Sequence, residues 1–334
     1  MNPLKLDPTR TTRLRSSFNS ALVTRFNLLK KELWNLLVHE DAFGLKQAKP
    51  LVLFNQEEWR YLRDDRKLEE LKKWLKFKTG QLFLKQEYQD SADTWLGNYI
   101  KQAYHKGLKR SWDDWKKPTG PISFSKEAGQ AYQQGQVAEF LRQSFGGPTP
   151  IERVKALATR TFNDVEGLTS DMETKLTRTL VDGMVNGLSP RKIGVELNKL
   201  VEGYKKRGTA IARTEIIRGF NEGALDGLEN LGVTQIGVMV EWTTSGMGVT
   251  KKGNPSPCSK CAPLAGLVLT VEEARGLLPR HPNCMCSYVP ANVGEKTDKQ
   301  VRDAARIRAA IQASAKNDKS WIGAKKKFTT KKVA

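Results

Sequence analysis

The chain has 334 residues, of which 39% are hydrophobic, and its formal net charge is +20. This length predicts two or three domains, and the charge indicates a polyanionic partner, most often nucleic acid. A run of about 18 apolar residues and the apolar core of a signal peptide are both missing, which excludes a transmembrane helix and predicts a protein of the reducing cytoplasm.

The first part of the chain, residues 1–148, is predicted to be helical and elongated. Apolar residues recur there every three or four positions, which is the period of a helix with one apolar face. The stretches with this pattern are 11–39, a segment that starts near Gln56, 83–109 and 126–145. Pro118 and Pro121 separate the last two, and the Gly-Gly-Pro triplet at 146–148 predicts a domain boundary.

The middle part, residues 149–292, begins with predicted helices and ends with predicted strands. Ser170 with Glu173 three residues later has the pattern of a capping box, and Ser189 before Pro190 predicts another helix start. The predicted helices are 150–159, 170–187, 189–200 and 207–231, and the predicted strands are 236–243, 267–270 and 287–290. The fold class is therefore mainly α with a small, compact α+β domain, closed by the Cys/His cluster described below.

The last part, residues 293–334, is basic and is predicted to be flexible. From Gly294 onward it holds twelve lysines or arginines against four acidic residues, a composition typical of disordered segments. This tail either binds phosphates without reading the base sequence or only keeps the protein in solution. The residues predicted to bind nucleic acid are Lys325, Lys326, Lys327, Lys331 and Lys332.

All four cysteines and one of the three histidines lie between residues 258 and 286. Thiolate and imidazole are preferred ligands of tetrahedral zinc, and a short, loop-rich segment buries little core by itself. We therefore predict a structural zinc site with four protein ligands. A disulfide or redox role and reduced, packed cysteines remain open as alternatives. The candidate ligands are Cys258, Cys261, His281, Cys284 and Cys286.

A longer set of residues resembles a known family. The helix around 210–223 contains Ala-Arg-Thr-Glu and then Asn221, and it is followed by Trp242-Thr-Thr, Cys258-x-x-Cys261, Gly266 and His281-Pro-Asn-Cys284-Met-Cys286. In order and spacing, residues 166–290 resemble the phage Mu F-like head-morphogenesis family, the minor capsid proteins. Met285 stands where that family carries an arginine. The family-motif residues, which are given a structural role, are Arg213, Thr214, Glu215, Asn221, Trp242 and Gly266.

The resemblance implies a minor protein of the phage head, located inside the capsid of the virion and in the host cytoplasm during assembly. The implied partners are the portal protein, the major capsid or scaffolding protein, and phage DNA bound without sequence preference during packaging or ejection. The amphipathic helix at 11–39 is then either a helix that docks onto a partner or an ordinary core helix.

Two other classes of protein remain open. Loops that mix Cys-x-x-Cys with histidine and asparagine also occur in HNH-type nucleases, so the alternative is a zinc-bearing nuclease or toxin-like effector enzyme. Such an enzyme needs a general-base histidine and an open metal position, and only His281 is near. We therefore expect no enzymatic activity, and we expect Arg213 and Glu215 to form ion pairs or caps. The third interpretation is a cytoplasmic zinc protein that binds nucleic acid and is absent from virions.

Overall fold

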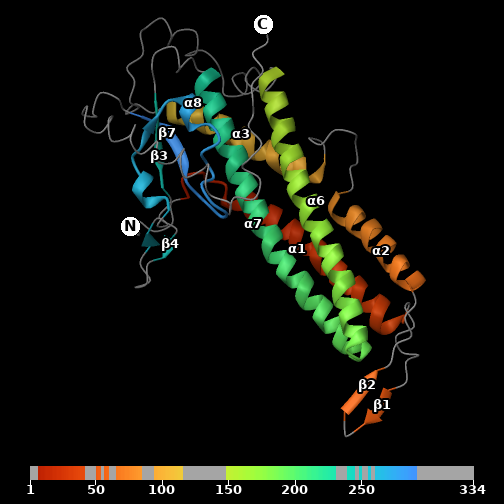
Figure 1. The fold of residues 1–334 in the computed structure, drawn as a ribbon. Coiled ribbons are helices and arrows are strands. Elements are labelled where there is room, and N and C mark those ends of the chain that lie inside the picture. The colour runs from red at the N-terminus through yellow and green to blue at the C-terminus, as the bar shows by residue number, and fades with distance from the viewer. Residues whose placement is uncertain are drawn as a thin grey trace, which may run out of the picture. The chain divides into compact units, whose positions relative to one another are not determined.

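The computed structural model describes the chain in separate stretches: residues 7–41, 50–53, 56–59, 65–84, 94–115, 148–230, 239–244, 248–249, 255–256 and 260–291. The described residues are mostly helical, with a small sheet in the C-terminal part of the chain (Figure 1). This confirms the predicted fold class. Within the described part, no helix is both long and apolar enough to cross a membrane. The predicted helix at 126–145 and the basic tail at 293–334 lie outside the described residues.

Long helices account for most of the described chain. They are α1 (Thr12–Trp34), α2 (Asp65–Thr79), α3 (Trp95–Trp115), α6 (Pro148–Val185) and α7 (Pro190–Asn230). Two π-helical turns continue α1 and α2, namely η1 (Asn35–His39) and η3 (Gly80–Leu84). Between residues 260 and 291, which the structure describes, the helical elements are the 3-10 turn η5 (Ala262–Leu264) and the short helix α8 (Val271–Ala274).

The strands are short and all of their pairings are antiparallel. The three-stranded sheet has the order β6-β3-β7, formed by Val268–Leu269, Val240–Thr243 and Ser287–Pro290. Two further pairs are β1 (Pro50–Leu53) with β2 (Gln56–Trp59), and β4 (Gly248–Val249) with β5 (Pro255–Ser256). The predicted strands at 236–243, 267–270 and 287–290 thus correspond to β3, β6 and β7, with β3 described only from residue 240.

The chain forms two compact units, each assembled from segments that are distant in sequence. Unit 1 contains residues 1–13, 100–154 and 214–334, and unit 2 contains residues 14–99 and 155–213. The domain boundaries predicted at residues 148 and 292 fall at the edges of stretches outside the described residues, so they stay predictions.

In unit 2, the apolar face of α1 is part of the core. Phe18, Leu22, Phe26 and Leu29 are fully buried, and Phe18 stacks on Tyr99 with ring centroids 4.6 Å apart. Because this face is covered within the unit, the structure favours the interpretation of the 11–39 segment as a core helix over that of a docking helix.

In unit 1, α3 and α7 approach each other at glycines. A Cβ atom on Gly107 would lie 2.0 Å from the carbonyl oxygen of Phe220, and one on Gly223 would lie 2.2 Å from that of Tyr104. Real Cβ atoms do not come this close to backbone, so only glycine permits this packing. Gly219 and Gly227 extend the same face of α7, one turn to either side.

Three helix boundaries differ from the sequence prediction. Residues 56–59 form a strand rather than a helix start, because they pair with the apolar run of β1. The helices predicted at 150–159 and 170–187 are one helix, α6, and those predicted at 189–200 and 207–231 are one helix, α7. Ser170 is therefore not a cap, whereas the Ser189 hydroxyl does accept a hydrogen bond from the Lys192 amide at 3.3 Å.

Candidate metal centre

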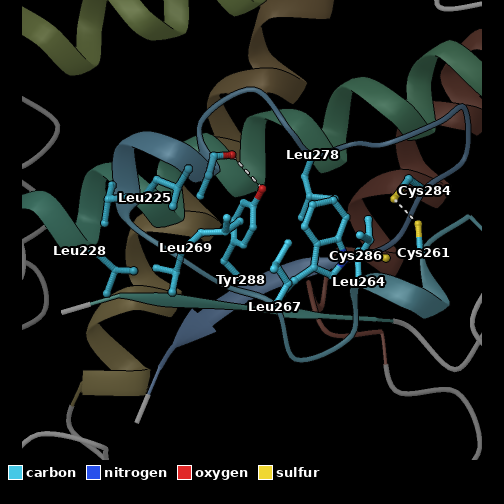
Figure 2. Packing of buried hydrophobic residues seen from close by; sticks show 14 of the residues in the cluster. Leu225, Leu228, Cys261, Leu264, Leu267, Leu269, Leu278, Cys284, Cys286 and Tyr288 are labelled. Atoms are coloured by element: carbon cyan, nitrogen blue, oxygen red, sulfur yellow. Dashed lines mark hydrogen bonds between the residues drawn. The ribbon is translucent and has the colours of Figure 1, made fainter. Parts of the chain in front are cut away.

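The sheet β6-β3-β7 holds the segments that carry the cysteines. Trp242 of β3 lies opposite Tyr288 of β7, and the two rings meet edge to face with centroids 5.8 Å apart. Both rings are buried, and the Tyr288 hydroxyl donates a 2.8 Å hydrogen bond to the carbonyl of Ala274 (Figure 2). Trp242 is thus part of the buried core beside the cysteines.

Three of the predicted metal ligands come together beside this core. The Cys261 Sγ atom lies 3.3 Å from Nε2 of His281. It lies 3.9 Å from Sγ of Cys284 (Figure 2). The ligand atoms of these three residues all lie within 4.8 Å of one another, the two cysteines buried and the histidine half-buried. The sequence separates Cys261 from Cys284 by a turn, a strand and a helix, so the fold itself creates this cluster.

The spacing of the cluster fits tetrahedral zinc. With ordinary zinc–sulfur and zinc–nitrogen bonds, two thiolates should be about 3.8 Å apart, and a thiolate and an imidazole nitrogen about 3.6 Å apart. The observed separations of 3.9 and 3.3 Å are close to both values. The described residues therefore supply three of the four positions that a structural zinc site needs.

The orientation of His281 also suits a metal ligand. Its Nδ1 atom lies 2.8 Å from the carbonyl oxygen of Pro282. A carbonyl oxygen can only accept, so in the neutral ring Nδ1 carries the proton and the lone pair of Nε2 faces the Sγ atom of Cys261. A backbone hydrogen bond of this kind fixes the tautomer that binds metal.

The pKa values of Cys261 and Cys284 shift in opposite directions. Hydrogen bonds to the thiols of Cys284 and Cys286, together with burial, raise the pKa of Cys261. Hydrogen bonds from Cys261 and Cys286 lower the pKa of Cys284. Cysteine binds metal as thiolate, so binding a cation would release the proton of Cys261.

The remaining cysteines differ in position. Cys286 is buried in the same apolar cluster as Leu264 and Tyr288, but it is not a member of the group of three ligands. Cys261, Cys284 and Cys286 are free thiols, so no disulfide joins these described cysteines. Cys258 lies outside the described residues, and its predicted role as a ligand stays a prediction.

Two motif residues of α7 hold the segment that contains His281 and Cys284. Thr214 Oγ1 accepts a 3.1 Å hydrogen bond from the amide of Asn283, and Nδ2 of Asn221 donates to the carbonyl of Cys286 at 3.2 Å. The two side chains are seven residues apart and therefore lie on one face of the helix. Asn283 itself has a positive φ of 60°, and its anchored amide fixes the turn between His281 and Cys284.

The other motif residues have distinct places. Glu215 is buried and pairs with Arg218 at 3.2 Å rather than with Arg213, which is exposed. Gly266 has a φ of +78°, and its amide donates to the carbonyl of Trp242 at 2.9 Å. A residue with a side chain would be strained in this left-handed conformation, which explains a glycine at this point of the β3–β6 connection.

A buried polar network on α7 was missed by the sequence analysis. Arg275, just after α8, lies 3.2 Å from Glu222, 2.6 Å from Asp226 and in contact with Glu229. Burial alone would lower the pKa of Arg275, but the three carboxylates together raise it. The signal in the sequence was the spacing of Glu222, Asp226 and Glu229 by four and three residues, which puts these acidic side chains on one face of the helix.

A second set of groups completes this network from α3 and α6. Nε of Arg153 lies 2.6 Å from Asp226, and the Tyr104 hydroxyl donates to the same carboxylate. Burial raises the pKa of Tyr104 and the Asp226 carboxylate raises it further. The network connects residues of α3, α6, α7 and the loop after α8 within unit 1. Its charged groups are paired with one another.

Lys325, Lys326, Lys327, Lys331 and Lys332 lie outside the described residues, so their predicted DNA binding stays a prediction. No protein-family model matches the chain, and neither a curated protein nor a solved structure matches it.

Proposed function

We propose that this protein is a minor head protein of a phage, of the Mu F-like head-morphogenesis type. The observation that carries the proposal is that residues of the resemblance bond directly to one another. Thr214 and Asn221 of the Ala-Arg-Thr-Glu helix bind the backbone of Asn283 and Cys286 in the closing motif. A set of residues that matches in order and spacing and also meets in space supports a shared domain better than matching letters alone.

The proposed place of the protein is the interior of the capsid, next to the portal. Its partners there are the portal protein, the major capsid or scaffolding protein, and packaged DNA, with a role in head morphogenesis and in DNA packaging or ejection. The net charge of +20 supports contact with DNA phosphates, because cationic side chains release the counterions condensed on the duplex. The basic tail is the first proposed contact.

The metal bound by this domain is proposed to be a structural zinc ion. Its ligands would be Cys261, His281 and Cys284, with Cys258 as the fourth, which gives a closed site without a position for substrate. His281 is engaged with Cys261 through Nε2 and with Pro282 through Nδ1. It is therefore not free to act as a general base, which supports a role without catalysis.

Metal analysis of the purified protein tests the zinc proposal. The wild-type chain should contain one zinc ion, and substitution of Cys258, Cys261 or Cys284 by serine should abolish zinc retention. Cys286→Ala is the matched control, because it removes an equally buried thiol but should keep the metal. A strong chelator should lower the melting temperature of the wild type. Equal zinc content in the Cys261→Ser and Cys286→Ala variants would contradict this ligand set.

Quantitative mass spectrometry of purified, DNA-filled particles tests the head-protein proposal. We expect the protein at a low copy number relative to the major capsid protein. A comparison before and after triggered DNA ejection shows whether it leaves with the genome. Its complete absence from particles would overturn the proposal and favour a cytoplasmic nucleic-acid-binding protein instead.

A further inference from the structure

Helix α7 carries a line of four cations, each seven residues from the next: Lys192, Lys199, Lys206 and Arg213. Seven residues are nearly two turns of an α-helix, so these side chains project from almost the same direction. Their spacing is about 10.5 Å, and the line extends over about 32 Å. We refer to these four residues as the basic stripe, and all of them belong to unit 2.

The basic stripe is exposed and largely unneutralised. All four side chains are exposed, and within the described residues only Lys199 has an acidic partner, Glu196 at 2.6 Å. The other acidic residue in this half of α7 is Glu202, which already pairs with Lys30 and Lys205. Seven lysines or arginines stand against these two glutamates between residues 190 and 213, so this stretch of the helix is strongly positive.

The same face offers little apolar surface. Val195 is the only exposed large hydrophobic residue in the described length of α7, and Gly203 and Ala210 lie between the cations. A protein partner gains most of its affinity from apolar and aromatic groups that lose contact with water. A nucleic acid backbone needs no such groups, because its affinity comes from charge neutralisation and counterion release.

We infer that the basic stripe binds the phosphodiester backbone of duplex DNA without sequence preference. Three of its four members are lysines, which act as mobile point charges and suit phosphates whose positions vary with DNA sequence and bend. The inference rests on the proposed contact of this protein with packaged DNA, and it adds a rigid, folded binding surface to the basic tail. It also gives Arg213, which is exposed, a role in binding rather than in the fold.

The test is a titration of the full-length, zinc-loaded protein with a labelled duplex of mixed sequence at a series of salt concentrations. The stripe variant carries Lys192→Gln, Lys199→Gln, Lys206→Gln and Arg213→Gln. The matched control carries Lys31→Gln, Lys73→Gln, Lys76→Gln and Lys106→Gln, which are equally exposed and lose the same charge from α1, α2 and α3. A tail variant replaces Lys325, Lys326, Lys327, Lys331 and Lys332 by glutamine. Circular dichroism verifies the helical content of each variant.

The salt dependence identifies the contacts. Each cation that neutralises a phosphate contributes about 0.9 to the slope of log K against log salt, so the stripe variant should lose about 3.6 of this slope and the control less than about 1. The tail variant should also lose part of this slope, and a protein that carries both sets of substitutions should lose the sum of the two amounts. Equal losses in stripe and control variants would overturn the inference while leaving DNA binding by the tail intact.

Two further outcomes are informative. If the wild type binds no duplex at all, the DNA contact of the proposed function fails together with the inference, whatever particle analysis shows. If the stripe variant loses binding to polyglutamate but keeps its affinity and salt slope for DNA, the inference is overturned in favour of an acidic protein partner.

Discussion

Asn221 connects helix α7 to the metal-binding segment through a single amide. Its Nδ2 atom donates to the carbonyls of Ile217 and Cys286, and the residue is 1% exposed. Asn221→Asp keeps the shape but replaces the donor by a carboxylate that faces two carbonyl oxygens. We expect a loss of about 3 kcal/mol in the free energy of unfolding at neutral pH, measured by urea denaturation.

Asn98→Asp is the control for this substitution, because Asn98 is exposed on α3. The same change of charge should there alter stability by no more than about 0.5 kcal/mol. Equal effects at the two positions would mean that the Asn221 amide does not hold the segment.

The lowered pKa of Asp171 makes the free energy of unfolding depend on pH in the acid range. The hydroxyl of Tyr204 and the guanidinium of Arg207 both bond to its carboxylate, at 2.6 and 2.8 Å, and they lower the pKa of Asp171 to about 2. A carboxyl group whose pKa is depressed by folding stabilises the protein above its unfolded pKa of about 4 and loses this effect as the pH falls towards 2.

Asp171→Asn should therefore cost about 0.5 kcal/mol at neutral pH, a small value because the side chain is 39% exposed. The difference between wild type and variant should vanish between pH 4 and about 2. Asp182→Asn is the control, since its carboxylate lies 3.6 Å from an exposed Arg178, and it should have little effect at any pH. Thermal melts of all three proteins across this pH range measure both effects.

At the scale of elements, the approach of α3 to α7 depends on glycine. A Cβ on Gly223 would meet the carbonyl oxygen, carbonyl carbon and Cα of Tyr104, all of them backbone atoms that cannot rotate away. Gly223→Ala must therefore push the two helices apart, and we expect a loss of about 3 kcal/mol in the free energy of unfolding. Thermal and urea denaturation measure it.

Gly167→Ala on α6 is the comparison. Gly167 is exposed within a helix and a Cβ there would meet nothing within 4 Å, so alanine should stabilise the protein by up to about 1 kcal/mol. Opposite signs for the two substitutions are the expected outcome. A loss of stability in both variants would argue against the close helix contact.

The long helices were predictable from their apolar period, but their continuity was not. Ser170 and Glu173 have the local pattern of a capping box, yet the Glu173 carboxylate accepts a hydrogen bond from Thr79, the last residue of α2. A partner 94 residues away leaves no trace in the local sequence. The real capping box in the described chain, Thr270 with Glu273 before α8, had the same signature in a segment where a strand was expected.

The candidate site was predictable to the extent that its residues are close in sequence. His281 and Cys284 share one turn, so the proximity of these two residues followed from the pattern, whereas Cys258 lies outside the described residues. The sequence did not predict that Cys284 rather than Cys286 lies in the group with Cys261 and His281, because this depends on how Thr214 holds the turn at Asn283. The Arg275 network could not be predicted for the same reason, since its charged groups come from α6, α7 and the residue after α8, and its tyrosine from α3.

At the scale of the whole molecule, the interleaving of the two units bears on the predicted domain of residues 149–292. In unit 1, Trp112 of α3 is buried in the same cluster as Leu225 and Trp242, and in unit 2, Phe26 of α1 packs where Gly208 leaves room. Both aromatic residues lie before residue 149. A fragment that starts there would expose the surface of α7 that they cover, at a cost of about 2 kcal/mol for each large side chain removed.

We therefore expect a fragment of residues 149–292 to lack a cooperative unfolding transition even when zinc is present, because zinc fixes only the segment around Cys261 and His281. A chain of residues 1–292, which lacks only the basic tail, should melt within a few degrees of the full-length protein. Calorimetry and heteronuclear NMR of both fragments show whether residues 149–292 fold alone or need residues 1–148. If 149–292 melts cooperatively at the temperature of the longer chain, then the boundary predicted at residue 148 is a true domain boundary and the helices of residues 1–148 are an independent addition.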